Sequence, residues 1–155
     1  MGKKLELIVE KTVGILLAVL VLLLFAQVIT RFVFVGSMLW ASEMAVWIFV
    51  WITFLGASLL LKKKEHMTVN VLEILLPEYL YNKIKVFLDI IIQIIIYVFL
   101  AIVFYNALPV VSSVSNQYAT SVEISKVFLY SSLPLSIIMM FIFLIVSLIE
   151  RIRGK

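Results

Sequence analysis

The sequence predicts an all-α integral membrane protein with four transmembrane helices and both chain ends in the cytoplasm. Three observations predict this fold class: the composition, the length of four apolar runs, and the placement of the positive charges. Of the 155 residues, 65% are apolar and 14% are charged, and the mean hydropathy is +1.21. Soluble domains are about 45–50% apolar and about 25% charged. A water-soluble fold of this length could not hide so much apolar surface, so lipid is the expected solvent.

Four apolar runs are long enough to cross a bilayer. We expect spans at about residues 12–35, 42–62, 86–108 and 127–149 of a single membrane domain, with Pro109 ending the third. About 20 helical residues, rising about 1.5 Å each, cross a hydrocarbon core of roughly 30 Å. The runs must be helices, because isolated strands would leave backbone amides unpaired in lipid.

The first run could instead be a secretory signal peptide, because Lys3 and Lys4 precede it. It is longer than an ordinary signal-peptide core, however, and no small-x-small cleavage site precedes Arg31. We therefore expect the first run to remain in the protein as a transmembrane helix.

The Lys and Arg residues set the expected direction of the helices. Of the 13, eleven lie before the first span, between the second and third, or after the fourth, whereas Arg31 and Lys126 lie on the other side. The positive-inside rule places the eleven in the cytoplasm. The net charge of +4 therefore reflects orientation signals, and we expect a lipid environment and no nucleic-acid partner.

The cytoplasmic connection between the second and third spans predicts an interfacial helix over about residues 67–76. Asn70 and Glu73 form a narrow polar stripe among Val and Leu side chains, which suits a helix lying in the headgroup plane. Pro77 then ends this helix and can begin the next one. The alternative is a solvated amphipathic linker.

Trp40, Glu43, Trp47 and Trp51 share one face of the second predicted helix. An aromatic belt at the membrane surface accounts for Trp40. The other two tryptophans lie one and two turns deeper, where a buried contact with another membrane protein fits better. Glu43 is the only acid near Arg31, and the two either pair and close the first hairpin or are solvated separately. The sequence leaves both arrangements open.

The connection between the third and fourth spans is rich in Ser, Asn, Gln and Thr. It contains Thr120-x-x-Glu123, which has the spacing of a capping box ahead of an apolar run. This spacing predicts a helix start at that point.

The spans carry no Asp, Glu, Lys, Arg or His near their middle, where such groups are costly and usually functional. Neutral polar residues inside the spans are expected to link helices by hydrogen bonds, and Gly56 to mark a close approach of two helices. The neutral polar residues are Gln27, Thr30, Thr53, Ser58, Gln93 and Asn106. With no Cys, and with His66 as the one histidine, thiolate metal sites and a bis-histidine haem are excluded. The sequence predicts no catalytic, metal or cofactor site.

Several short motifs follow one another along the first two spans and the loop behind them. They are Arg31-Phe-Val-Phe, Leu39-Trp40-Ala-Ser-Glu43, Phe49-Val-Trp51, Phe54-Leu-Gly56-Ala, Lys64-Glu-His66-Met-Thr-Val69 and Leu76-Pro77. The fourth span is entered through Tyr130-Ser-Ser-Leu-Pro134-Leu. In order and spacing these motifs resemble the small membrane subunit of tripartite ATP-independent periplasmic (TRAP) transporters, the DctQ-like or Q subunit. The resemblance covers essentially the whole chain.

The resemblance implies a sodium-coupled importer of organic acids in the bacterial inner membrane, built from three parts. A periplasmic binding protein captures the substrate, and a large permease (M) subunit carries the substrate and sodium sites. The small subunit braces the permease and contributes to docking of the binding protein. Carried over to this sequence, Arg31, Trp40, Glu43, Gly56, His66 and Pro77 are structural or subunit-contact positions and not ligands. A lysine run precedes His66 where the family often has a glycine.

Two other functions compete with this interpretation. A self-sufficient small exporter or channel, acting as a homo-oligomer, is the main alternative. An enzyme of lipid metabolism is weaker, because no cluster of His, Asp or Glu supports it. The substrate of a TRAP system could be a C4-dicarboxylate, sialic acid or another carboxylate, because the resemblance implies that specificity resides in the other two components.

Overall fold

The computed structural model describes residues 2–33, 39–64 and 78–152. The helices are α1 (Gly2–Val33), α2 (Leu39–Lys64), α4 (Glu78–Ser113), α5 (Val127–Tyr130) and α6 (Ser132–Ile152). In this part of the chain, β structure is limited to one isolated antiparallel bridge between Tyr118 and Ser125. The predicted all-helical class is confirmed. The predicted interfacial helix, together with His66 and Pro77, lies outside the described residues.

Within the described ranges, four helices are long and apolar enough to span a membrane, as predicted. The spanning windows are Lys4–Phe32, Leu39–Lys62, Ile90–Ser113 and Val127–Ser147. Each window has a mean hydropathy of 2.2 or more, so lipid can surround each helix along this length.

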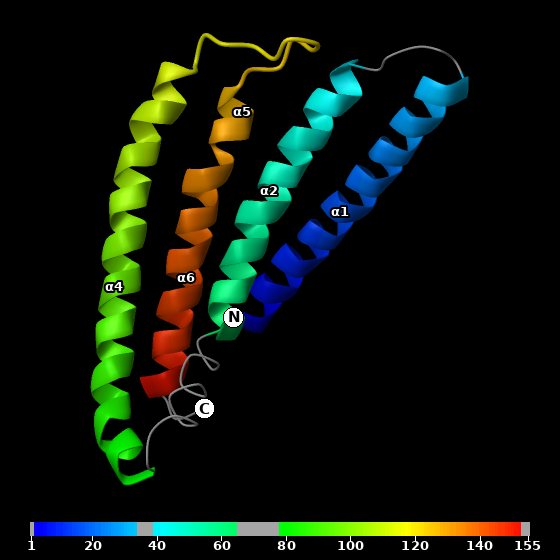
Figure 1. Cartoon of the computed structure of the whole chain (residues 1–155). Helices are drawn as coiled ribbons and strands as arrows, with labels where there is room; N and C mark the ends of the chain where they lie inside the picture. Colours follow the sequence, from blue (N-terminus) through cyan, green and yellow to red (C-terminus); the bar gives the residue numbers. More distant parts are fainter. Residues whose placement is uncertain (1, 34–38, 65–77, 153–155) are drawn as a thin grey trace.

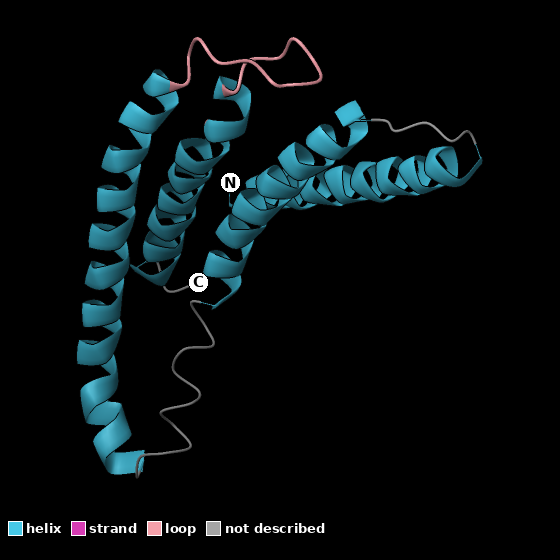
Figure 2. Cartoon of the chain, turned by 45° about the horizontal axis from the view of Figure 1, so that its top comes forward, coloured by secondary structure: helices cyan, strands magenta, loops and turns pink. Residues whose placement is uncertain are grey.

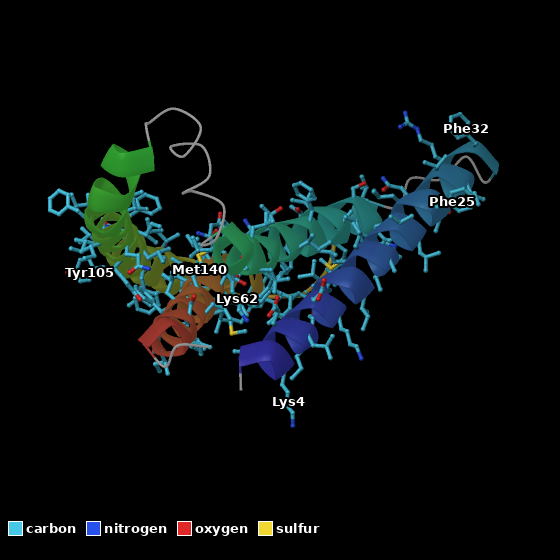
Figure 3. All side chains as sticks on the ribbon, turned by 90° about the horizontal axis from the view of Figure 1, so that it is seen from below. Lys4, Phe25, Phe32, Lys62, Tyr105 and Met140 are labelled. Carbon is cyan, nitrogen blue, oxygen red and sulfur yellow. The ribbon has the colours of Figure 1, made fainter. Side chains whose placement is uncertain are left out.

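The long helices stand side by side in an open, curved row (Figures 1 and 3). Helix α2 packs against α1 on one side and against α6 on the other, and α4 packs against the far side of α6. Each long helix has one of its two tips on the same side of the row, and on that side α1 begins and α6 ends (Figure 1). We call this side the terminal end. The opposite end, where α1 and α4 end and α2 and α5 begin, is the hairpin end.

The outer helices of the row are largely uncovered by the rest of the chain. Only 6% of the α1 window and 11% of the α4 window are buried. Figure 3 shows Phe25 and Phe32 on the side of α1 away from the other helices, and both are exposed, as is Tyr105 of α4. Lipid or another membrane protein must therefore cover α1 and α4.

Two small apolar clusters hold the row together. One joins three helices, through Val9 of α1, Leu59 of α2 and Phe143 of α6. The other joins α4 to α6 through Leu100 and Ile137, with further apolar side chains around them. Phe143 is fully buried at the contact of α1, α2 and α6.

Lys62 strengthens this three-helix contact. From the sequence we expected Lys62 only to be one of the positive charges that set the direction of the helices. Its ammonium lies 2.6 Å from the carboxylate of Glu6 on α1 and 5.5 Å from the centre of the Phe143 ring. Both members of the ion pair are partly buried, with side chains 13% and 25% exposed. One cation of α2 therefore contacts α1 and α6 at the terminal end, as Figure 3 illustrates.

Pro109 does not end the third span, and the prediction that it would is wrong. Helix α4 continues past Pro109 to Ser113. Proline removes one backbone donor, but here it lies in the penultimate turn of the helix, where few intrahelical bonds depend on it. The hydroxyls of Ser112 and Ser113 donate to the carbonyls of Pro109 and Val110, each at 2.8 Å, and so satisfy acceptors that the helix end leaves open.

The fourth span is a short helix followed by a long one, with a break at Ser131. Pro134 stands in the first turn of α6, where its missing N–H would otherwise have bonded toward α5. The hydroxyls of Ser132 and Ser136 donate to the carbonyls of Leu129 and Ser132, at 2.6 and 2.7 Å. These buried hydroxyls satisfy backbone acceptors around the break.

The neutral polar residues of the spans mostly bond to their own helix, which differs from the prediction that they link helices. The side chains of Thr30, Thr53 and Asn106 donate to the carbonyl four residues earlier, and Ser58 to the one three residues earlier. Gln27 behaves as predicted, since its amide donates to the hydroxyl of Ser42 and joins α1 to α2. In a helix, a Ser or Thr hydroxyl or an Asn amide can donate its hydrogen bond to a carbonyl of the same helix. That donor is then not available for a hydrogen bond to another helix.

Candidate interaction site

Apart from the Lys62–Glu6 pair at the terminal end, the polar side-chain contacts that join distant parts of the described chain lie toward the hairpin end. Within the described residues no group of three or more His, Cys, Asp or Glu side chains could hold a metal ion. The contacts described below come from the loop between α4 and α5 and from the first turns of α2.

Residues 117–126 reverse the direction of the chain in a compact loop, which we call the hairpin loop. The Lys126 N–H donates to the Gln117 carbonyl, and the Ala119 N–H donates to the Ile124 carbonyl, both at 2.9 Å. Tyr118 and Ser125 form the antiparallel bridge between these two bonds. The loop crosses from α4 over α5 and reaches toward the start of α2 (Figures 1 and 2).

This arrangement overturns the predicted helix start at Thr120-x-x-Glu123. These residues form the tip of the hairpin loop, and the next helix begins only at Val127, with Lys126 as an N-cap that makes no side-chain cap bond. The capping-box spacing did not decide the structure, because the Thr120 side chain bonds to another element instead.

That other element is α2, through Glu43. One carboxylate oxygen accepts the backbone N–H of Thr120 at 2.9 Å and its hydroxyl at 3.1 Å. The other oxygen accepts the backbone N–H of Ser121 at 2.9 Å. A single ionised side chain thus holds two consecutive backbone donors at the tip of the hairpin loop, in charge-assisted hydrogen bonds. We call this set of contacts the Glu43 latch.

The latch answers the question that the sequence left open about Arg31 and Glu43. The structure contains no ion pair between these two described residues: the Arg31 side chain is exposed, and the Glu43 carboxylate is occupied by the hairpin loop. Sequence reasoning missed the partner, because Thr120 follows Glu43 by 77 residues and no local pattern joins them.

The two deeper tryptophans hold α5 against α2 within the chain. The Trp51 indole N–H donates to the Phe128 carbonyl at 3.2 Å, and the two rings are 5.3 Å apart between centres. Trp47 stacks on the same Phe128 ring at 6.4 Å and is only 5% exposed. Trp47 is therefore covered largely by its own chain, and the contact of the two deeper tryptophans with another membrane protein stays a prediction. Trp40, at the hairpin end of α2, remains exposed.

Gly56 is not a close-packing point within this chain, contrary to the prediction. A Cβ placed on Gly56 would meet no atom within 4 Å. Any approach close enough to need a glycine at this position would have to come from outside the described residues.

Two grooves run along the row, and both are apolar. One, of about 420 Å³, lies between α1, α2 and Phe128 and has Trp47 and Trp51 in its wall. The other, of about 550 Å³, lies between α4 and the helices α2, α5 and α6, and its polar lining is limited to Asn106, Tyr130 and Ser132. Neither groove has a charged side chain in its lining, so neither offers the positive group that an organic anion would need.

Comparison with known proteins decides the family. A family profile described as tripartite ATP-independent periplasmic transporters, DctQ component, matches residues 20–154. The chain belongs to this family. The DctQ family is a transporter component and not an enzyme, and the chain is a multi-pass membrane protein of that kind.

Relatives in the DctQ family carry two different substrate names. The sialic acid TRAP transporter permease protein SiaT of Haemophilus influenzae (strain 86-028NP) is 29% identical over 134 residues, which are 86% of this chain and 21% of SiaT. The C4-dicarboxylate TRAP transporter small permease protein DctQ of Vibrio cholerae serotype O1 is 37% identical over 71 residues, which are 46% of this chain and 31% of that protein. The matches therefore span only a fifth to a third of the length of these relatives.

Proposed function

We propose that this chain is the non-catalytic small permease (Q) subunit of a sodium-coupled TRAP transporter that imports organic acids. In this role it braces the large permease (M) subunit and contributes to docking of the periplasmic substrate-binding protein. The observation that carries the proposal is the match of the DctQ profile to residues 20–154.

The open row of helices supports the bracing role. A row exposes more apolar helix surface than a closed bundle, and α1 and α4 are the least covered helices. The open space beside Gly56 would let another helix approach α2 closely. The apolar grooves offer no charged group for substrate, which agrees with a substrate path that lies in the large subunit.

We further propose that the terminal end faces the cytoplasm and the hairpin end the periplasm of a bacterial inner membrane. Lys4 and Lys11 lie in the first part of α1 and Lys62 near the end of α2, toward the terminal end of the row, and the positive-inside rule places the side rich in Lys and Arg in the cytoplasm. The substrate is an organic acid, since the relatives are named for sialic acid and for C4-dicarboxylates, both of which carry carboxylates.

Co-purification tests this proposal. The chain is expressed with an affinity-tagged large permease subunit of the same system, solubilised in mild detergent and purified through the tag. We expect the chain to elute with the tagged subunit in equal amounts, and an unrelated four-helix membrane protein of similar size to be lost. Isolation of the chain as a stable lone protein, with solute flux through liposomes that contain nothing else, would replace the proposal by a small homo-oligomeric exporter or channel.

A further inference from the structure

The hairpin loop lies outside the apolar part of the protein. The spanning windows on either side of it end at Ser113 and resume at Val127, so residues 117–126 belong to the aqueous surface of the membrane. Most of their side chains are polar, and most are exposed. A partner that contacts this loop therefore does so outside the hydrocarbon core, where a water-soluble protein can reach it.

The hairpin loop is also ordered in advance of any contact. The antiparallel bridge and its two neighbouring backbone bonds fix the base of the loop, and the Glu43 latch fixes its tip to α2. A loop held at both places loses little conformational entropy when it binds a partner. Without the Glu43 carboxylate, the amides of Thr120 and Ser121 would return to water and the tip would be free to move.

An exposed tyrosine stands on this ordered loop. Tyr118 is 61% exposed although it takes part in the bridge, so its backbone is fixed while its ring is open to contact. Tyrosine and tryptophan are the residues that most often dominate the binding energy of protein interfaces. Trp40, 44% exposed and three residues before Glu43 on α2, adds a second aromatic side chain at the same end of the row.

We propose that the hairpin loop, latched to α2 by Glu43, is a preformed docking surface for the soluble substrate-binding protein, with Tyr118 as its aromatic contact. Glu43 acts as a positioning residue: it orders the loop and does not itself touch the partner. This proposal rests on the proposed function, because it takes the binding protein of a TRAP system as the partner.

Cross-linking locates the docking surface. The sequence contains no cysteine, so Asn116→Cys places a unique thiol beside Tyr118 and Lys4→Cys places one at the opposite end of the row. Each variant, assembled with the large permease in vesicles and labelled with a photoactivatable thiol reagent, is mixed with the purified binding protein. We expect an adduct from Asn116→Cys and none from Lys4→Cys. An assembled, transporting complex that gives no adduct at position 116 would overturn the proposed surface.

Uptake kinetics test the latch and the tyrosine. The amide in Glu43→Gln cannot accept with both of its polar atoms, so the loop tip is released, and Tyr118→Ala removes the aromatic contact while leaving the backbone in place. We expect both variants to raise the half-saturating concentration of binding protein about tenfold, because preorganisation or a hot spot is lost, with little change in the maximal uptake rate. Glu10→Gln removes the same charge on α1, far from the loop, and should leave both quantities unchanged.

Hydrogen exchange separates the two roles. In Glu43→Gln the amides of Thr120 and Ser121 should exchange faster with solvent, whereas Tyr118→Ala should leave their exchange as it is. If the complex assembles and both variants keep the wild-type half-saturating concentration, the docking proposal is wrong and the proposed function stands. If the unaltered chain fails to assemble with the large permease, the proposed function itself fails.

Discussion

Replacing Trp47 by Ala should destabilise the chain from within. Trp47 is 5% exposed and stacks on Phe128 at 6.4 Å, so its removal opens a cavity between α2 and α5. A residual cavity on the order of 100 Å³, at about 24 cal/mol per Å³, costs about 2.4 kcal/mol. Loss of the aromatic pair adds about 0.5–1.5 kcal/mol. Because Trp47 lines the groove of about 420 Å³, lipid or detergent chains can enter part of the cavity, so we expect about 2–3 kcal/mol in all.

Unfolding of the purified chain by titration with sodium dodecyl sulfate, followed by circular dichroism, measures this free energy. Trp40→Ala is the matched control, because Trp40 lies on the same helix but is 44% exposed, and its replacement should change the free energy of unfolding by less than about 0.5 kcal/mol. The reasoning is refuted if the two variants are equally stable. If Trp47→Ala is less stable than Trp40→Ala, as we expect, any weakened assembly with the large permease would follow from loosened packing of α5 and not from a lost direct contact.

Two further predictions concern the terminal end and the middle of α2. Lys62→Met and Glu6→Gln should each destabilise the chain. A double-mutant cycle on the free energy of unfolding should give a coupling of about 1 kcal/mol for the 2.6 Å pair, and this coupling should decrease with added salt. A coupling of zero would show that the pair does not hold α1 to α2. Gly56→Ala should leave the isolated chain as stable as before, or slightly more stable, since the new methyl group meets nothing within 4 Å and alanine favours helix. A loss of stability in the isolated chain would contradict the open space seen beside Gly56, whereas weaker co-purification alone would place a partner helix there.

The spans could be predicted from sequence because the bilayer imposes their length. Any apolar run of about 20 residues has few alternatives to a transmembrane helix. The exact ends were less predictable, as Pro109 shows, because α4 continues past it to Ser113. A proline removes a single backbone donor, so close to the end of a helix it does not by itself decide where the helix stops.

Side-chain partners could not be predicted, because helices that are apolar on all sides do not reveal which face meets which neighbour. The sequence singled out Glu43 but suggested Arg31, its nearest opposite charge, whereas the structure joins it to backbone amides of the hairpin loop. The tryptophan stripe was recognised, yet its partner Phe128 lies on an element whose position depends on the whole row. Likewise Gly56 has the residue type of a packing point without a neighbour in this chain.

The family resemblance supplied what the side chains could not. Motifs spread from Arg31 to Pro134 were enough to identify the DctQ family, and the family profile over residues 20–154 confirms that identification. The resemblance did not predict the Glu43 latch, which depends on contacts that only the folded chain brings together.

Uptake by reconstituted vesicles tests the central claim most directly. Proteoliposomes with the large permease, with and without this chain, are given the binding protein loaded with radiolabelled sialic acid or a C4-dicarboxylate under an inward sodium gradient. We predict sodium-dependent uptake of one organic acid only when the chain is present, and no uptake by vesicles that contain the chain alone. Equal uptake in its absence, or flux through the chain by itself, would contradict a supporting subunit.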